Sequence, residues 1–439
     1  MSRRTFLAAA TAAGVSAAMK AKGGVSAVAK PALLGGKAVR KDGWPGWPVF
    51  DEKDEQAILK VLRSGQWFRG YGKHVDRFEE AYAQLMGAKY CVATANGTSS
   101  LVAALAGAGV EAGDEVILPP YTFVACVNAV LVLDALPVFV DTDRATFQID
   151  AKKIEAAITE HTRAIMPVHL GGNVVDLETV LSVAGKHKVP VIEDCCQAHM
   201  AEWKGKRVGI HGTAGCFSFQ ASKNLNSGEG GAILTNDEGM VERCHAAHTN
   251  GRTRKAGWSA ESARAWNFRM TEFQAGLLMT QMGRLEEQSR VREENAKYLS
   301  KMLRAIPGIR PAEMYEGCTR NAYHLYMFRY EKERFGGLGR GRFLQALSAE
   351  GIGAGGGYTP LNREAFIMNT LRSRGFGVVY SRSRIGEWEK RNRCPENDRL
   401  CEEGVWLTQN MLLGPRRDME QIAEAVGKIA GYAGELGRG

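Results

Sequence analysis

Long apolar runs, internal repeats and clusters of charge of one sign are all missing from this chain. Of its 439 residues, 45% are hydrophobic and 24% are charged, which is ordinary for a soluble globular protein. Beyond the N-terminal segment, no stretch is long enough and free enough of charge to span a membrane. The formal net charge of +9 comes from scattered Lys and Arg residues, with the closest approach to a cluster at 252–255. We therefore expect no membrane span in the mature protein and no nucleic-acid binding.

The chain also lacks cysteine pairs at the spacings of a metal site or a disulfide framework. It has nine cysteines, an odd number, and Cys394 and Cys401 have no second pair at metal-like spacing. Four others lie inside apolar runs: Cys91, Cys126, Cys195 and Cys216. A small thiol packs well in such surroundings, so we expect free structural thiols and no bound metal.

Residues 1–30 differ in character from the rest. Two arginines in the segment 2–7 precede Phe-Leu and a small, mildly apolar run, and Ala27-Val28-Ala29 resembles a cleavage site. This pattern predicts a twin-arginine signal and an exported, periplasmic protein. The alternative is an N-terminus that merely contains two arginines, in which case the protein is cytoplasmic. The twin-arginine route carries folded proteins, so export by it would leave the buried thiols unpaired.

Short apolar strands alternate regularly with helices through the middle of the chain. The expected strands are residues 90–94, 115–118, 137–140, 164–168, 189–193, 215–219 and 232–234. The expected helices cover 99–108 and 122–133, and two more begin at Asp150 and Asp176. This alternation favours an α/β fold with a mostly parallel sheet that is covered on both faces.

Helical patterns flank this region on both sides. The N-terminal ones lie at 51–64 and 75–86, and a long helix is expected over 271–303. Pro307 then introduces a strand at 324–330 and helices at 342–350 and 418–432. We expect a large domain over residues 31–305 and a smaller C-terminal α+β domain over residues 306–439.

An acid and a lysine follow neighbouring apolar strands. Asp194 ends one strand, and Lys223 lies five residues after Ser218, which ends the next. Pyridoxal phosphate chemistry needs both groups: the acid keeps the pyridine nitrogen protonated, and the lysine holds the aldehyde as a Schiff base and moves protons. The alternative for Lys223 is a surface lysine in a polar turn, which would be preferred if Lys223 stood alone.

A second polar segment, Asn96 to Ser100, lies between a strand and a helix. Backbone N–H groups at a helix start, together with hydroxyl groups, form an anion site suited to a phosphate. The alternative is a plain helix cap. On this motif alone the two interpretations are equally supported, but Gly97 and Thr98 combined with Asp194 and Ser218 make a surface lysine the weaker interpretation of Lys223.

Several motifs, in this order along the chain, resemble the DegT/DnrJ/EryC1/StrS family of pyridoxal-phosphate-dependent sugar aminotransferases. The matching segments are 96–98, 113–117, 121–123, 137–141, 167–169, 193–197, 218–224, 228–231 and 267–270. The resemblance extends from about residue 34 to the C-terminus. It implies fold type I, the aspartate-aminotransferase-like fold, and a homodimer with shared active sites.

The resemblance also implies a role for individual residues. Lys223 would form the Schiff base and carry the proton shift, and Asp194 would pair with the pyridine nitrogen. The remaining cofactor contacts would be Gly97, Thr98 and Ser218 at the phosphate, Phe123 on the ring face, Gln197 near the ring oxygen, and Asn267 reaching the phosphate from the neighbouring subunit. Met200 and Thr213 depart from the family pattern, which puts the shape of the loop between them in doubt.

Other segments are similar to one branch of the family, the 3-amino-5-hydroxybenzoate synthases and scyllo-inosose aminotransferases. This resemblance implies transfer of an amino group from glutamate or glutamine to a keto-sugar or keto-cyclitol in two half-reactions. Candidate substrate contacts are Arg69, Tyr71, His169 and Tyr358, and ordinary packing is the alternative for each. A sensor of the same fold that binds the cofactor without turnover is the main competing function, and a dehydratase or oxidoreductase is a weaker one.

Overall fold

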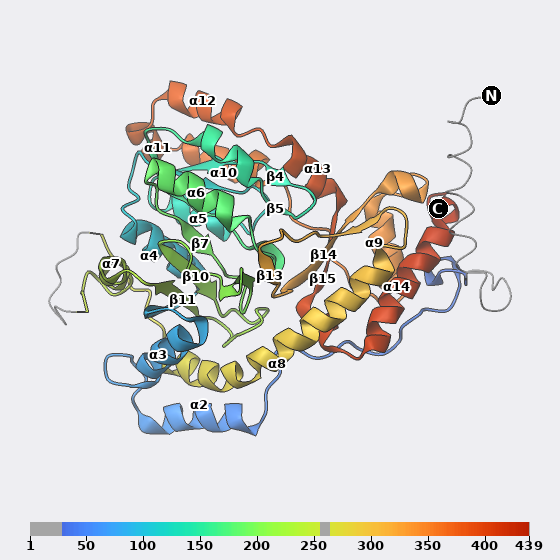
Figure 1. Cartoon of the computed structure of the whole chain (residues 1–439), viewed down its shortest axis with the longest axis horizontal. Helices are drawn as coiled ribbons and strands as arrows, with labels where there is room; N and C mark the ends of the chain where they lie inside the picture. The colour runs from blue at the N-terminus through green and yellow to red at the C-terminus, as the bar shows by residue number, and fades with distance from the viewer. Residues whose placement is uncertain (1–28, 255–263, 439) are drawn as a thin grey trace.

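The computed structural model describes residues 29–254 and 264–438 and shows two lobes, with one long helix, α8 (Glu272–Leu303), that extends from one lobe into the other (Figure 1). The predicted twin-arginine motif lies outside the described residues. Within the described ranges, no helix combines the length and the apolar character that crossing a membrane requires. Thr271 begins α8 with a capping box, because its side chain accepts from the backbone of Gln274, whose side chain accepts from the Thr271 backbone in return.

The large lobe is built on a central sheet. One part has the order β1-β11-β10-β7 and another has the order β3-β2-β6. Single parallel bridges, Ile165 to Val191 and Val168 to Asp194, connect the two parts. The strands are β1 (Tyr90–Thr94), β2 (Glu115–Leu118), β3 (Leu136–Phe139), β6 (Thr162–Ile165), β7 (Ile192–Asp194), β10 (Ala214–Ser218) and β11 (Gly231–Thr235). Only β11 runs antiparallel to its neighbours in this sheet, so the prediction of a mostly parallel sheet is confirmed.

Helices cover both faces of this sheet. One face packs against α4 (Gly97–Gly107), α5 (Ala125–Leu131) and α7 (Glu238–His248). The other face packs against α3 (His74–Met86), α6 (Leu177–His187) and the first half of α8, while α2 (Glu52–Ser64) lies against α8. Two-sided cover explains why successive residues are apolar within β2 (Val116 to Leu118) and β10 (Ala214 to Phe217).

The α-helix predicted from Asp150 is wrong. Asp150 does cap a turn, but the chain forms only two short 3-10 turns, Ala151–Lys153 and Glu155–Ala157. Ile158 is already extended, and β6 begins at Thr162. Too few residues separate Asp150 from β6 for an α-helix to form and for the chain to return to the sheet.

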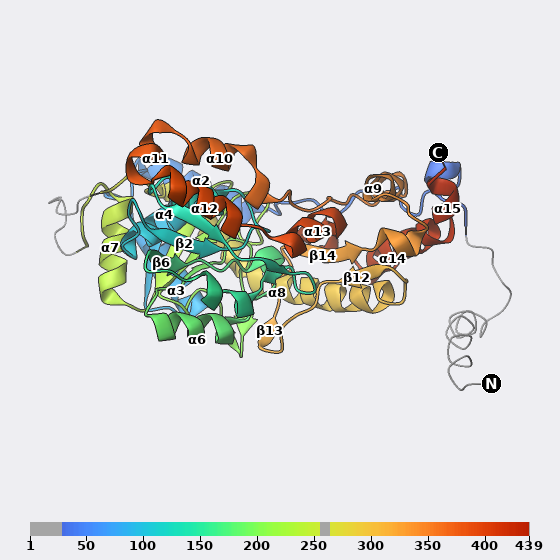
Figure 2. The same cartoon turned by 90° about the horizontal axis from the view of Figure 1, so that it is seen from above.

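The small lobe has an antiparallel sheet in the order β12-β14-β15. Its strands are β12 (Ile309–Pro311), β14 (Leu325–Tyr330) and β15 (Gly404–Thr408), and its helices are α9 (Arg340–Ala349), α14 (Arg416–Gly431) and α15 (Ala433–Leu436). The N-terminal residues 32–44 join this lobe through a buried ion pair between Arg40 and Asp418. The helices α10 (Ala365–Leu371), α11 (Arg374–Val379) and α12 (Arg382–Arg391) instead pack on the large lobe, and α13 (Pro395–Glu403) lies between the lobes, in contact with β14 and with β4 (Thr142–Asp143) (Figure 2). The division at residue 305 stays a prediction.

Candidate active site

The carboxyl ends of β7 and β10 and the start of α4 meet at one edge of the sheet. Asp194 ends β7, Ser218 ends β10, and Gly97 opens α4 directly after β1. A Cβ atom added to Gly97 would lie 2.6 Å from Cβ of Ser218 and 2.9 Å from Sγ of Cys196. Only glycine therefore lets the helix start come this close to the two strand ends.

The start of α4 has the features of an anion site. The Asn96 side chain accepts from the Ser99 N–H at 2.9 Å and so caps the helix. The other N–H groups of the first turn have no intrahelical acceptor, and Thr98 places an exposed hydroxyl group among them. Together with the Ser218 hydroxyl group, this arrangement suits a phosphate.

Asp194 is buried, and both of its carboxylate oxygens are engaged. Oδ1 accepts from the Cys196 backbone N–H at 3.0 Å, and Oδ2 accepts from the Cys126 thiol at 2.9 Å. Burial lowers the pKa of Lys223, although the Asp194 carboxylate acts in the opposite direction. The loop that carries Lys223 is held by Trp47, whose Nε1–H donates to the Ala221 carbonyl at 2.9 Å. The structure thus brings the predicted acid and lysine into one electrostatic environment.

Gln197 and Tyr358 connect the two sides of the site. Gln197 Oε1 accepts from the Gly171 N–H at 2.7 Å, and its Nε2–H donates to the Tyr358 hydroxyl group at 3.0 Å. The Asp194 carboxylate, after burial, adds to the rise in the Tyr358 pKa. Phe123, just ahead of α5, is 55% exposed, so its ring is accessible from outside the chain.

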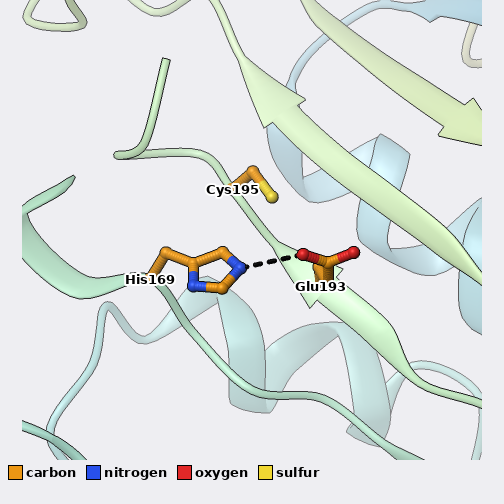
Figure 3. Close-up of side chains that lie close together, drawn as sticks. All are labelled: His169, Glu193 and Cys195. Carbon is orange, nitrogen blue, oxygen red and sulfur yellow. Dashed lines mark hydrogen bonds and ion pairs between the residues drawn. The ribbon is translucent and has the colours of Figure 1, made fainter. Parts of the chain in front are cut away.

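His169 does not open into the site. Its ring is completely buried, Nδ1 accepts from the Val175 N–H at 3.3 Å, and Nε2 donates to Glu193 at 3.1 Å (Figure 3). Glu193 also accepts from three backbone N–H groups of the following loop: Gly209 at 2.9 Å, His211 at 2.8 Å and Gly212 at 2.7 Å. Both ring nitrogens of His169 are therefore used within the protein, and neither is left for a substrate.

The cluster of His169, Glu193 and Cys195 has ligand atoms within 4.8 Å of one another, which is close enough to hold a metal ion. However, the Glu193 oxygens already accept four hydrogen bonds. Burial, followed by the charge of Glu193, also raises the pKa of the Cys195 thiol far above its usual range. A thiol that keeps its proton is a poor metal ligand, so these contacts serve the fold.

Three predicted site residues make their contacts away from the Asp194 side chain. Arg69 pairs with Glu79 at 3.0 Å and lines a cavity of about 490 Å³ beside β1. Tyr71 is 72% exposed and meets Phe68 edge-on. Asn267 is exposed and forms an isolated antiparallel β-bridge with Thr249. The structure of one subunit does not bring these three residues to Lys223.

Comparison with known proteins agrees with this geometry. A model of the DegT/DnrJ/EryC1/StrS aminotransferase family matches residues 48–375. The chain belongs to this family. It is an aminotransferase, and its fold is the predicted fold type I.

Individual relatives resemble this aminotransferase over nearly their whole length. An L-glutamine:2-deoxy-scyllo-inosose aminotransferase of Streptomyces lividus is 37% identical over 420 residues, which is 92% of this chain and 98% of that one. The enzyme of the same description from Streptomyces fradiae is 36% identical over 420 residues, with the same coverage. The crystal structure of 3-amino-5-hydroxybenzoic acid synthase matches with a TM-score of 0.79 and 32% identity, covering 92% of this chain and all of that one.

Sequence reasoning missed one group in the aminotransferase site. The sequence predicts that Cys126 only packs in an apolar run, yet its thiol donates to Asp194. The sequence does place Thr122 and Cys126 four residues apart after the end of a strand, and this spacing lets two side chains contact each other on one face of a helix. No local pattern could indicate that Asp194, which lies 68 residues further along, accepts from this thiol.

Proposed function

We propose that the chain binds pyridoxal 5'-phosphate and transfers an amino group from glutamine or glutamate to a keto-cyclitol or keto-sugar. The observation that carries this proposal is the meeting of Asp194, Lys223 and the start of α4 at one sheet edge. A buried carboxylate, an amine with a lowered pKa and an anion site are the three groups that this cofactor requires.

In this proposal each group of the chain has one task. Gly97, Thr98 and Ser218 hold the phosphate, and Asp194 faces the ring nitrogen. When bound, the cofactor supplies an electron sink for charge that develops at the amino-bearing carbon. Lys223 holds the cofactor and then takes and returns a proton through Nζ. Its lowered pKa supports this role, because an amine must be free of its proton to act as a base near neutral pH.

The remaining contacts concern the ring and the substrate. Phe123 offers an open aromatic face for stacking, and Gln197 lies beside Tyr358. Among the candidate substrate contacts, Tyr358 has the strongest support, since its hydroxyl group is bonded to Gln197. The relatives described as L-glutamine:2-deoxy-scyllo-inosose aminotransferases make L-glutamine the first donor to test and a cyclic polyol ketone the first acceptor.

The experiment uses the visible absorbance of the protein reconstituted with pyridoxal phosphate. We expect a band that bleaches on addition of L-glutamine and returns on addition of a keto-inositol. A panel of nucleotide-linked keto-sugars tests the other acceptor class. A band that no amino donor bleaches would instead favour a sensor that binds the cofactor without turnover.

We further propose a homodimer with shared sites and export through the twin-arginine segment. Support for the dimer comes from the exposure of Phe123 and Asn267, which leaves the site of one subunit open. Support for export comes from the sequence of residues 1–30 alone.

A further inference from the structure

A thiol contacts the central carboxylate of the site. Sγ of Cys126 lies 2.9 Å from Oδ2 of Asp194, and both side chains are buried. Oγ1 of Thr122 lies 3.1 Å from the same sulfur. Cys126 is in the first turn of α5, three residues after Phe123, so one short segment carries both the open aromatic ring and this thiol.

The chemistry of the hydroxyl, thiol and carboxylate groups determines which of them donates in each of these hydrogen bonds. Burial, followed by the Asp194 charge, raises the pKa of the Cys126 thiol far above its usual range, so the sulfur keeps its hydrogen. An ionised carboxylate can only accept, so the thiol donates to Asp194. Thr122 then donates its hydroxyl hydrogen to the sulfur. The result is a relay from Thr122 through Cys126 to Asp194.

This arrangement orients the Asp194 carboxylate and leaves each of its oxygens able to accept another hydrogen bond. Its Oδ1 accepts from the Cys196 N–H at 3.0 Å, so each oxygen has one donor from the protein and a second lone pair to spare. A thiol is a weaker donor than a hydroxyl group, so it fixes the plane of the carboxylate while withdrawing little of its charge. A serine in the same place would withdraw more.

We propose that Cys126 is a positioning residue that sets the orientation of Asp194 and its basicity toward the ring nitrogen of the cofactor. The proposal rests on the proposed function, because it takes Asp194 as the partner of that nitrogen. The competing explanation is that Cys126 only fills space in the core that it shares with Cys244. Cys244 lies on α7 in the same core and supplies a matched control.

The first test needs no cofactor. The S–H stretching band of Cys126 is obtained as the infrared difference between the wild-type apoprotein and Cys126→Ala. We expect this band to lie at lower frequency than the Cys244 band, obtained in the same way, and to move toward it in Asp194→Asn. A Cys126 band that has the same frequency as the Cys244 band and does not shift in Asp194→Asn would overturn the proposal.

The second test uses the holoenzyme with ¹⁵N in the ring of pyridoxal phosphate. Cys126→Ala should lower kcat about tenfold and leave KM for glutamine nearly unchanged, because a misdirected carboxylate affects the reaction more than substrate binding. Cys126→Ser should restore kcat to within about twofold of wild type, since a donor is present again. Both variants should move the ring-nitrogen signal toward the unprotonated value, alanine because the carboxylate is misdirected and serine because a hydroxyl group withdraws more of its charge.

The controls separate this inference from the proposed function. Cys244→Ala should leave kcat and the ring-nitrogen signal unchanged. A wild-type protein that fails to bind pyridoxal phosphate would overturn the proposed function, and the role of Cys126 with it. A wild-type protein that binds it with a protonated ring, while the Cys126 variants leave the signal unmoved, would overturn the inference alone.

Discussion

The buried floor of the site and its open rim are built on different principles. The floor, defined by Glu193 and Asp194, is enclosed, and hydrogen bonds engage its carboxylate oxygens. The rim is Phe123, which is exposed in the single chain, and in the proposed homodimer it would also include Tyr71 and Asn267, which are exposed as well. A fixed floor suits chemistry that tolerates little movement, whereas an open rim can be completed by a substrate or by a second subunit. We therefore expect the floor to set the chemistry of the site and the rim to influence the choice of acceptor.

The largest expected effect comes from removing the amine of Lys223. Lys223→Ala should lower the rate of the glutamine half-reaction by about 10³-fold or more, because it removes the amine to which the proton transfer is assigned. Cofactor binding should survive, since the phosphate site and Asp194 are intact. Stopped-flow absorbance with L-glutamine measures the rate, and equilibrium dialysis measures cofactor binding. Full activity in Lys223→Ala would remove this residue from the mechanism.

The same variant tests whether the rim is shared between subunits. Mixed dimers are prepared in which one subunit carries Lys223→Ala and the other Asn267→Ala, and activity is measured at limiting pyridoxal phosphate. If Asn267 acts across the interface, one site of each mixed dimer has both residues, and activity should reach about half of the wild-type value. If Asn267 acts within its own chain, neither site is intact and activity stays low.

A smaller effect is expected from Glu193, the residue of the floor that anchors the following loop. Glu193→Gln replaces a carboxylate that accepts four hydrogen bonds by an amide whose N–H₂ faces donors. We expect the free energy of unfolding to fall by about 3 kcal/mol, measured by urea denaturation of the apoprotein. Glu178→Gln, which loses only an exposed pair with Lys204, should change it by less than about 1 kcal/mol. Equal losses in the two variants would show that Glu193 is no anchor.

The pH dependence of this loss has a definite sign. Burial alone would raise the pKa of Glu193, but the hydrogen bond from His169, together with that from the Gly212 N–H, helps to hold the pKa below its usual value of 4.5. A group with a lowered pKa stabilises the folded state above its unfolded pKa and loses this contribution as the pH falls through the folded pKa. The difference between wild type and Glu193→Gln should therefore be full above pH 4.5 and shrink below it.

The contrast between floor and rim also explains what the sequence could predict. Gly97, Asp194 and Lys223 occur in local motifs at strand ends, and the parallel sheet alone brings such ends together. The contacts of His169 with Glu193 and of Cys126 with Asp194 join distant segments, so no local pattern indicated them.

Backbone conformation was equally hidden from the sequence. Met200 stands where the family usually has glycine, and a change of loop shape was considered. It has a φ of 69°, in the left-handed region that glycine favours, and its side chain is buried. A left-handed backbone is strained at a residue other than glycine, and here it occurs together with burial of the Met200 side chain. Only the tertiary structure reveals this combination.

The smallest effect should come from Tyr358, where the floor meets the rim. Tyr358→Phe removes the hydroxyl group that accepts from Gln197, together with the one hydrogen that Tyr358 has left to donate. We expect KM for the keto acceptor to rise about fivefold, and the glutamine half-reaction to stay within about twofold of wild type. Tyr380→Phe is the matched control, because its hydroxyl group donates to the Asp134 carbonyl on the large lobe. It should lower stability without changing KM. If instead Tyr358→Phe slows the glutamine half-reaction and leaves KM for the keto acceptor unchanged, Tyr358 acts on the floor of the site through Gln197. Selection of the acceptor would then depend on the exposed rim.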